Sequence, residues 1–278
     1  MRLRFVLAVP AVLGVLALPL AAQDFPALGR EIESLVREKF YDAARGERWA
    51  SENAGYAVEI RDAETFRRET RRRLAALGAS HTEYYTPEDP GYRDLLSIFE
   101  PVLHRSGEGE SLGLAAAERE DGWFVARVFA GGPAEAAGLR RGDRLVSLDG
   151  APFKPVLHGK AGRPILLEIQ SSRNGPSRTV TVTSRTIDPK KEWLEAQIGG
   201  TRVIERNGRR MGYVPVWSCA GVEVEETLRE ALAEKLAEAE ALVLDLRGGW
   251  GGCDPALVGL FDPAVPDLTR IDRQGKST

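Results

Sequence analysis

The stretch Leu242–Gly252, LVLDLRGGWGG, decides the fold of this chain. Its apolar first half is typical of a strand buried in a parallel sheet. Four glycines around Trp250 then predict a loop, and Cys253-Asp254-Pro255 predicts a helix start with Asp254 as N-cap and Pro255 as first helical residue. Such a corner gathers free backbone N–H groups, so it can hold a phosphate, a carboxylate or the oxyanion of acyl transfer.

The preceding segment predicts how this corner is built. A hairpin turn at Asn207-Gly208 precedes a strand at 211–217, an amphipathic helix at 222–239 and a strand at 241–246. Strand, helix and parallel strand form a right-handed crossover, which places the glycines beyond the carboxyl ends of neighbouring strands. The spacings that nucleotide sites require are absent, which disfavours phosphate. A tight turn that binds nothing also fits the glycines.

Composition excludes several classes of function. The 278 residues suffice for two compact domains, and a net charge of −3 gives no reason to expect nucleic acid as a partner. Arg2 and Arg4 precede an apolar stretch that ends in small residues, which predicts a signal peptide cleaved before Gln23. The mature protein is therefore expected to be periplasmic or extracellular, without stable membrane insertion.

The cysteines and histidines add two expectations. Cys219 and Cys253 each follow a predicted strand, and in an oxidising compartment they form either a disulfide or two separate buried thiols. The three histidines lie far apart and none has the spacing of metal ligands, so no metal is expected.

Two further segments precede the crossover. Residues 24–77 show helical periodicity and lead into the loop Ser80-His81-Thr82, where a histidine is either structural or catalytic. Residues 109–187 change to short alternating strands, one small helix and regular turns, including a hairpin at Asn174-Gly175, and predict a compact β-rich module.

These segments, in this order, resemble the C-terminal processing, or tail-specific, serine peptidases. The module from Gly113 to Asp149 looks like their PDZ domain, and LVLDLRGGWGG is similar to their D-L-R-x-N-x-G-G motif, with Gly249 in place of the asparagine. The stretch LAALGASHTEYY resembles their histidine motif, and its Ser80-His81 pair is closest to the tricorn-core-like branch.

The resemblance implies a multidomain α+β and α/β protein that ends in a partial α/β domain of ClpP/crotonase type. The expected parts are a signal peptide (1–22), an N-terminal helical segment with the Ser-His-Thr motif (23–100), a PDZ-like domain (101–187) and the start of the peptidase domain (188–278).

The resemblance also implies roles for individual residues. His81 acts as general base, Ser80 joins its polar relay, and Gly251 and Gly252 supply N–H groups to the oxyanion. The PDZ module adds an extended peptide as a strand, with the peptide carboxylate in the loop around Leu112-Gly113-Leu114. Residues 151–162, which normally form the second groove-lining helix, are short and contain two prolines, so a shallow groove is expected.

The nucleophilic serine of the family has no counterpart here. Beyond Gly252 the one serine is Ser277, in a polar tail without the strand-turn-helix context of a nucleophile. Leu242–Leu246 is also expected to be an exposed apolar edge strand, an aggregation hazard. The chain is therefore expected to be the front part of a peptidase, inactive as given. His81 and a downstream lysine remain alternatives for the general base.

Two functions follow from the sequence. The first is a secreted serine-type endopeptidase, a hydrolase that performs proteolysis of polypeptides near their C-termini and is expected to need no metal or cofactor. The alternative is a non-catalytic, PDZ-based peptide-binding protein, an inactive relative of the peptidases. In both, the expected partner is a polypeptide substrate or a C-terminal peptide.

Overall fold

The structure of the chain is a computed structural model that describes residues 24–157, 161–253, 255–261, 269, 271–273 and 275–277. The predicted signal peptide, His158 and the predicted N-cap Asp254 lie outside the described residues. The chain divides into two units, 1–85 with 266–278 and 86–265, which are described separately. In the part of the chain that the structure describes, no helix combines the length and the apolar character needed to cross a bilayer.

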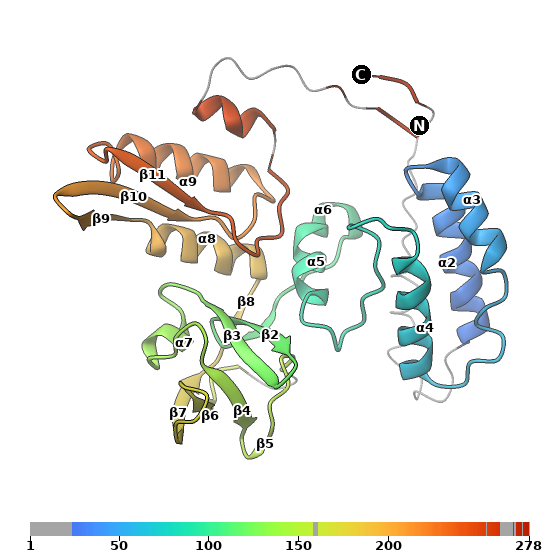
Figure 1. Cartoon of the computed structure of the whole chain (residues 1–278), viewed down its shortest axis with the longest axis horizontal. Helices are drawn as coiled ribbons and strands as arrows, with labels where there is room; N and C mark the ends of the chain where they lie inside the picture. Colours follow the sequence, from blue (N-terminus) through green and yellow to red (C-terminus); the bar gives the residue numbers. More distant parts are fainter. Residues whose placement is uncertain are drawn as a thin grey trace. The chain divides into compact units, whose positions relative to one another are not determined.

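The first unit is helical, as the periodicity of residues 24–77 predicts. It contains α2 (Phe25–Lys39), α3 (Ala43–Glu52) and α4 (Ala63–Ala75) (Figure 1). Each helix follows an aspartate N-cap whose carboxylate accepts a backbone N–H three residues later. The core surrounds Phe66, which is 1% exposed and stacks on Phe25 with the ring centroids 5.2 Å apart.

The second unit begins with two short helices and a small two-stranded sheet. Helices α5 (Tyr92–Ile98) and α6 (Glu100–Leu103) precede β1 (Gly109–Ser111), which pairs antiparallel with β8 (Arg185–Ile187). Arg93 of α5 fastens this pair, because its guanidinium donates to the carbonyls of Gly107, Glu110 and Ile187.

The predicted β-rich module is an antiparallel sheet in the order β2-β3-β4-β6-β7, with β5 also paired to β4. Its elements are β2 (Leu114–Arg119), β3 (Gly122–Val128), α7 (Pro133–Ala136), β4 (Arg144–Leu148), β5 (Ala151–Pro152), β6 (Pro164–Gln170) and β7 (Ser177–Thr183). The core gathers the inward side chains of β6 and β7, among them the fully buried Ile165, Leu167 and Val182. The described residues between β5 and β6 form no helix. The shallow groove expected there stays a prediction.

The predicted crossover is also present. Helix α8 (Pro189–Gly200) leads to the hairpin of β9 (Arg202–Arg206) and β10 (Arg209–Pro215), and α9 (Val222–Ala233) leads to β11 (Ala241–Asp245). Strands β10 and β11 are parallel, and Figure 1 shows α9 lying along their sheet. The hairpin turn has positive φ at both Asn207 (55°) and Gly208 (72°), as a two-residue turn of this kind requires.

Two predicted helices differ from those observed. Helix α9 ends at Ala233 rather than at residue 239, because the chain turns after Glu234 and buries Leu236 against the sheet. The helix predicted to start at Pro255 is the six-residue 3₁₀ helix Pro255–Leu260. The fold as a whole is a mixture of helix and sheet with N-terminal helices, as predicted.

Candidate functional site: the glycine corner

The Asp-Leu-Arg sequence forms a clasp at the carboxyl end of β11. Asp245 accepts hydrogen bonds from Arg247 Nε (2.7 Å) and Nη2 (2.6 Å) and from the Tyr213 hydroxyl of β10 (2.9 Å). The Arg247 hydrogen bonds hold the pKa of Asp245 well below its usual value, although burial acts in the opposite direction. The carboxylate therefore stays ionised and fixes the point where the chain leaves the strand.

The glycines after the clasp form the corner itself. Gly248, Gly251 and Gly252 have φ of 64°, 72° and 86°, conformations that glycine adopts at little cost. The Trp250 N–H donates to the Trp217 carbonyl (2.9 Å), and the Gly251 carbonyl accepts from the Cys219 N–H (2.8 Å). Among the described residues, no hydrogen bond uses the N–H of Gly251 or Gly252. The two donors that the sequence assigns to an oxyanion thus have no acceptor in the part of the chain that the structure describes.

A cavity of about 240 Å³ borders this corner. Its wall is mostly apolar, and it includes Gly252, the two cysteines and the first turns of α9, with Glu225 as the charged side chain. An apolar cavity next to these amide groups suits the uncharged side chain of a bound peptide, with the adjacent peptide carbonyl close to the glycines.

A disulfide between Cys219 and Cys253 closes the corner, with the Cα atoms 4.5 Å apart. The sequence leaves open whether the two cysteines form a disulfide or two separate thiols, and the structure shows the disulfide. The bridge ties the segment after β10 to the end of the glycine loop, so the two strand ends and the loop are one covalently closed unit.

The indole of Trp250 anchors the loop from the other side. Its Nε1–H donates to Asp94 Oδ2 of α5 at 2.8 Å. Burial of the Asp94 carboxyl raises its pKa to about 6, although the hydrogen bond from Trp250 and the charge of Arg93 act against this shift. The loop is therefore attached to a carboxyl group that titrates near neutral pH.

Arg127 connects the antiparallel sheet to the same loop. It projects from β3, and its guanidinium carbon lies 4.9 Å from the centre of the Trp217 ring. A side chain at Gly248 would collide with this guanidinium, since a Cβ there would lie 1.9 Å from Nη2. A side chain there would have to displace the Arg127 guanidinium, and the φ of 64° already favours glycine at this position.

Ser80 and His81 form a hydrogen-bonded pair after α4. Ser80 Oγ lies 2.8 Å from His81 Nδ1, and both residues are exposed. If Nδ1 carries the proton and donates to Ser80, Nε2 is left with a free lone pair, as a general base requires. The pair belongs to the first unit and the glycines to the second, so their joint role stays a prediction.

The predicted peptide loop Leu112-Gly113-Leu114 opens the antiparallel sheet. Leu112 is 5% exposed, and Gly113 is buried with φ of 75°. The Gly113 N–H already donates to Ser111 Oγ at 3.0 Å, and Ser111 in turn donates to Glu192 of α8. Peptide binding by this loop stays a prediction.

Comparisons with known proteins identify relatives of the PDZ domain and of a longer part of the chain. The PDZ domain family matches residues 100–162. A carboxyl-terminal-processing protease of Picosynechococcus sp. is 28% identical over 191 residues, which are 64% of this chain and 42% of that protein. The chain contains a PDZ domain and is homologous to a carboxyl-terminal-processing protease. The human Disks large homolog 3 is 33% identical over 85 residues, 30% of this chain and 10% of that protein.

The chain thus spans less than half the length of the protease that it matches. Among solved structures, a photosystem II D1 C-terminal processing protease aligns with a TM-score of 0.46 and 21% identity, over 84% of this chain and 63% of that chain.

Three charged residues that contact the glycine corner or the PDZ domain are not predicted from the sequence: Asp94, Arg127 and Glu192. Asp94 lies 156 residues before Trp250, and Arg127 and Glu192 sit on separate elements. No local spacing links such residues, although an aspartate in the short helix α5 and the unusual tryptophan between glycines are visible in the sequence. No cluster of three or more metal-ligating side chains occurs within the described ranges.

Proposed function

We propose that the chain is part of a secreted serine-type endopeptidase of the carboxyl-terminal-processing kind. The observation that carries the proposal is the glycine corner, where the N–H groups of Gly251 and Gly252 have no acceptor among the described residues and lie beside an apolar cavity. The homology to a carboxyl-terminal-processing protease supports the same assignment.

In the proposed reaction, a serine hydroxyl attacks the scissile carbonyl of a bound polypeptide. As the tetrahedral intermediate forms, its oxygen gains negative charge, and the N–H groups of Gly251 and Gly252 donate to it. His81, held by Ser80, or a lysine takes the proton of the hydroxyl and returns it to the leaving amine. The PDZ domain holds the polypeptide as an added strand.

The proposal assigns the nucleophile to a part of the protein outside these 278 residues. Ser277 is a poor candidate, because it is an exposed residue in an isolated bridge with Ile271, and the described residues just before it form no strand or helix start. The chain as given is therefore expected not to hydrolyse peptides.

The test compares two forms of the protein. The product of the complete reading frame should hydrolyse an unfolded polypeptide such as reduced casein, and the 278-residue chain should not. In the longer protein, His81→Ala should lower kcat by about 10² to 10⁴ if His81 is the base, and Ser277→Ala should have no effect. Turnover by the 278-residue chain that disappears in Ser277→Ala would contradict the placement of the nucleophile.

Secretion is a separate part of the proposal. Expression in a bacterium with a periplasm, followed by N-terminal sequencing, should give a mature chain that begins at Gln23. A cytoplasmic chain that retains Met1 would contradict it.

The alternative function is a non-catalytic peptide-binding protein. The PDZ domain favours it, because its sheet and core lie entirely within the given residues. The two functions differ in the DNA after codon 278: an immediate stop codon supports the binding protein, and an open frame that encodes a serine in a strand-turn-helix context supports the peptidase.

A further inference from the structure

The hydrogen bonds of Ser111 restrict what the PDZ loop can bind. Ser111 Oγ lies 2.7 and 2.9 Å from the two carboxylate oxygens of Glu192, and 3.0 Å from the Gly113 nitrogen. A hydroxyl has one proton, which is here committed to the carboxylate, so a lone pair of Oγ faces the Gly113 N–H. The central donor of the loop is thus satisfied within the chain.

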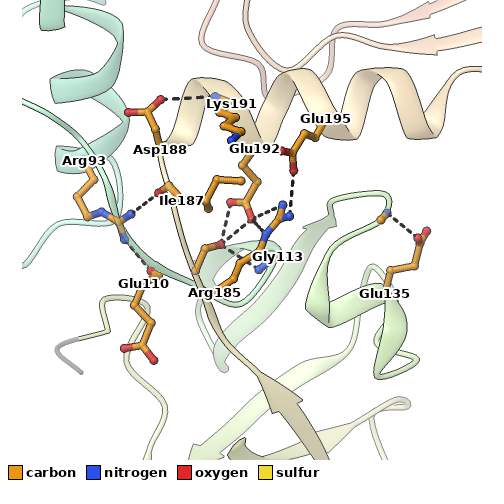
Figure 2. Close-up of polar contacts among 12 residues, drawn as sticks. Arg93, Glu110, Gly113, Glu135, Arg185, Ile187, Asp188, Lys191, Glu192 and Glu195 are labelled. Atoms are coloured by element: carbon orange, nitrogen blue, oxygen red, sulfur yellow. Dashed lines mark hydrogen bonds and ion pairs between the residues drawn. The ribbon is translucent and has the colours of Figure 1, made fainter. Parts of the chain in front are cut away.

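Negative charge lies directly behind this hydroxyl. Glu192 is 5% exposed, and Arg185 contacts both it (3.2 Å) and Glu195 (2.9 Å). One guanidinium thus serves two carboxylates, as Figure 2 shows. A peptide carboxylate at Gly113 would lie one hydroxyl away from Glu192, and like charges at such a distance repel each other.

Gly113 also packs closely against the start of α7. A Cβ at Gly113 would lie 2.7 Å from Cδ of Pro133, the first residue of α7. The buried Leu112 fills the space on the preceding side. A carboxylate could reach the Gly113 N–H only by displacing Ser111 from it.

The adjacent strand, by contrast, can accept a partner. In the antiparallel sheet β2 pairs with β3, and no described residue pairs with its other edge. Such an edge recognises an extended segment through main-chain hydrogen bonds, which an internal stretch of polypeptide provides as well as a chain end.

We propose that this PDZ domain binds internal extended segments of polypeptides rather than free C-terminal carboxylates, and that Ser111 determines this specificity. The proposal rests on the peptide-binding role assigned to the PDZ domain above. It replaces the expected carboxylate contact at Leu112-Gly113-Leu114 with strand addition along β2.

The test measures binding of two matched pools of fluorescein-labelled random decapeptides to the whole 278-residue chain at pH 7. One pool ends in a carboxylate and the other in a carboxamide, and fluorescence anisotropy gives an apparent Kd for each. The wild-type chain should bind both pools with Kd values within about two-fold of each other. Preference for the carboxylate pool by about tenfold or more would overturn the proposal.

Three variants assign the effect to Ser111. Ser111→Ala frees the Gly113 N–H and should shift the Kd ratio toward the carboxylate pool by about fivefold. Glu192→Gln keeps a hydrogen-bond acceptor for Ser111 while it removes the charge, and should shift the ratio in the same direction. Ser111→Thr retains the hydroxyl and is the matched control, with an unchanged ratio.

The outcomes separate this proposal from the proposed function. Ratios in Glu192→Gln and Ser111→Ala that equal the wild-type ratio would overturn the role of Ser111, and Glu192→Gln provides this comparison even if Ser111→Ala does not fold. Failure of the folded wild-type chain to bind either pool would contradict the peptide-binding function itself.

Discussion

At the scale of single residues, the chemistry of the glycine corner depends on what surrounds it. The corner sequence predicts free amides, and the structure adds the groups that hold them in place, above all the Asp94 carboxyl that accepts from Trp250. Burial of the Asp94 carboxyl raises its pKa. This carboxyl is therefore the titratable group whose ionisation is tested first.

The first prediction concerns the ionisation of Asp94. The indole N–H signal of Trp250 should titrate with a midpoint near pH 6 in an NMR experiment, because the pKa of Asp94 is raised to about 6. Asp94→Asn should abolish this titration while it keeps an acceptor for the indole. A midpoint near pH 4 would contradict the burial of the carboxyl.

The same shift has a consequence for stability. A carboxyl whose pKa is higher in the folded protein than in the unfolded chain binds its proton more tightly when folded. It therefore stabilises the fold below about pH 4, and this contribution of about 2 to 3 kcal/mol is lost as the pH rises to 6. The free-energy difference between wild type and Asp94→Asn, measured by urea unfolding, should change in this direction.

The next prediction compares two glycines with similar backbones. Gly113 and Gly208 have φ of 75° and 72°, but a Cβ at Gly113 meets Pro133 and a Cβ at Gly208 meets nothing within 4 Å. Gly208→Ala should cost about 1 kcal/mol for the backbone strain alone. Gly113→Ala should cost about 2 to 4 kcal/mol, because overpacking adds to the strain. Equal losses in thermal unfolding would show that Pro133 does not crowd the loop.

At the scale of elements, periodicity and turn residues predict most of the second unit. Asn207-Gly208 predicts its hairpin, and the apolar run before Asp245 predicts the parallel strand β11. The end of α9 is not predicted, because the buried Leu236 continues the apolar stripe although the chain has left the helix. The sequence also does not predict whether the disulfide forms. Pairing depends on the distance between the two cysteines in space, and a separation of 34 residues along the chain does not determine that distance.

Removal of the disulfide tests the closed unit formed by β10, β11 and the glycine loop. Loss of a bridge over 34 residues should destabilise this unit by about 4 kcal/mol in the chain-entropy account. Urea unfolding of the double variant Cys219→Ser/Cys253→Ser checks the value. Reductant should lower the stability of wild type toward that of the variant and leave the variant unchanged. If reductant leaves the stability of the wild-type chain unchanged, the disulfide is contradicted.

The exposed edge of β11 gives a prediction about solubility. Val243 is 45% and Leu246 58% exposed, and among the described residues β11 pairs with β10 alone. An apolar edge of this kind pairs with other chains. The 278-residue chain should therefore self-associate as its concentration rises in sedimentation experiments, and Val243→Lys should suppress this association. Equal self-association of the wild-type chain and the Val243→Lys variant would show that the edge of β11 is not the surface through which the chains associate.

At the scale of the whole molecule, the order of segments supports the functional proposal. The helical segment with Ser80-His81, the PDZ domain and the glycine corner follow one another as in the family that the sequence resembles, and the PDZ domain and the homology to a carboxyl-terminal-processing protease are confirmed. The contacts of the PDZ domain are not predictable in this way, since Arg127 and Ser111 act through partners on distant elements.

The central claim is that the N–H groups of Gly251 and Gly252 bind the negative charge of a tetrahedral intermediate. An amide NMR titration of the ¹⁵N-labelled chain with a peptide phosphonate, a tetrahedral anion, tests it most directly. We predict downfield proton shifts at Gly251 and Gly252 that saturate together, with no shift at the turn residue Gly208. Signals of both glycines that stay in place at saturating phosphonate, in a chain that is folded, would contradict the account.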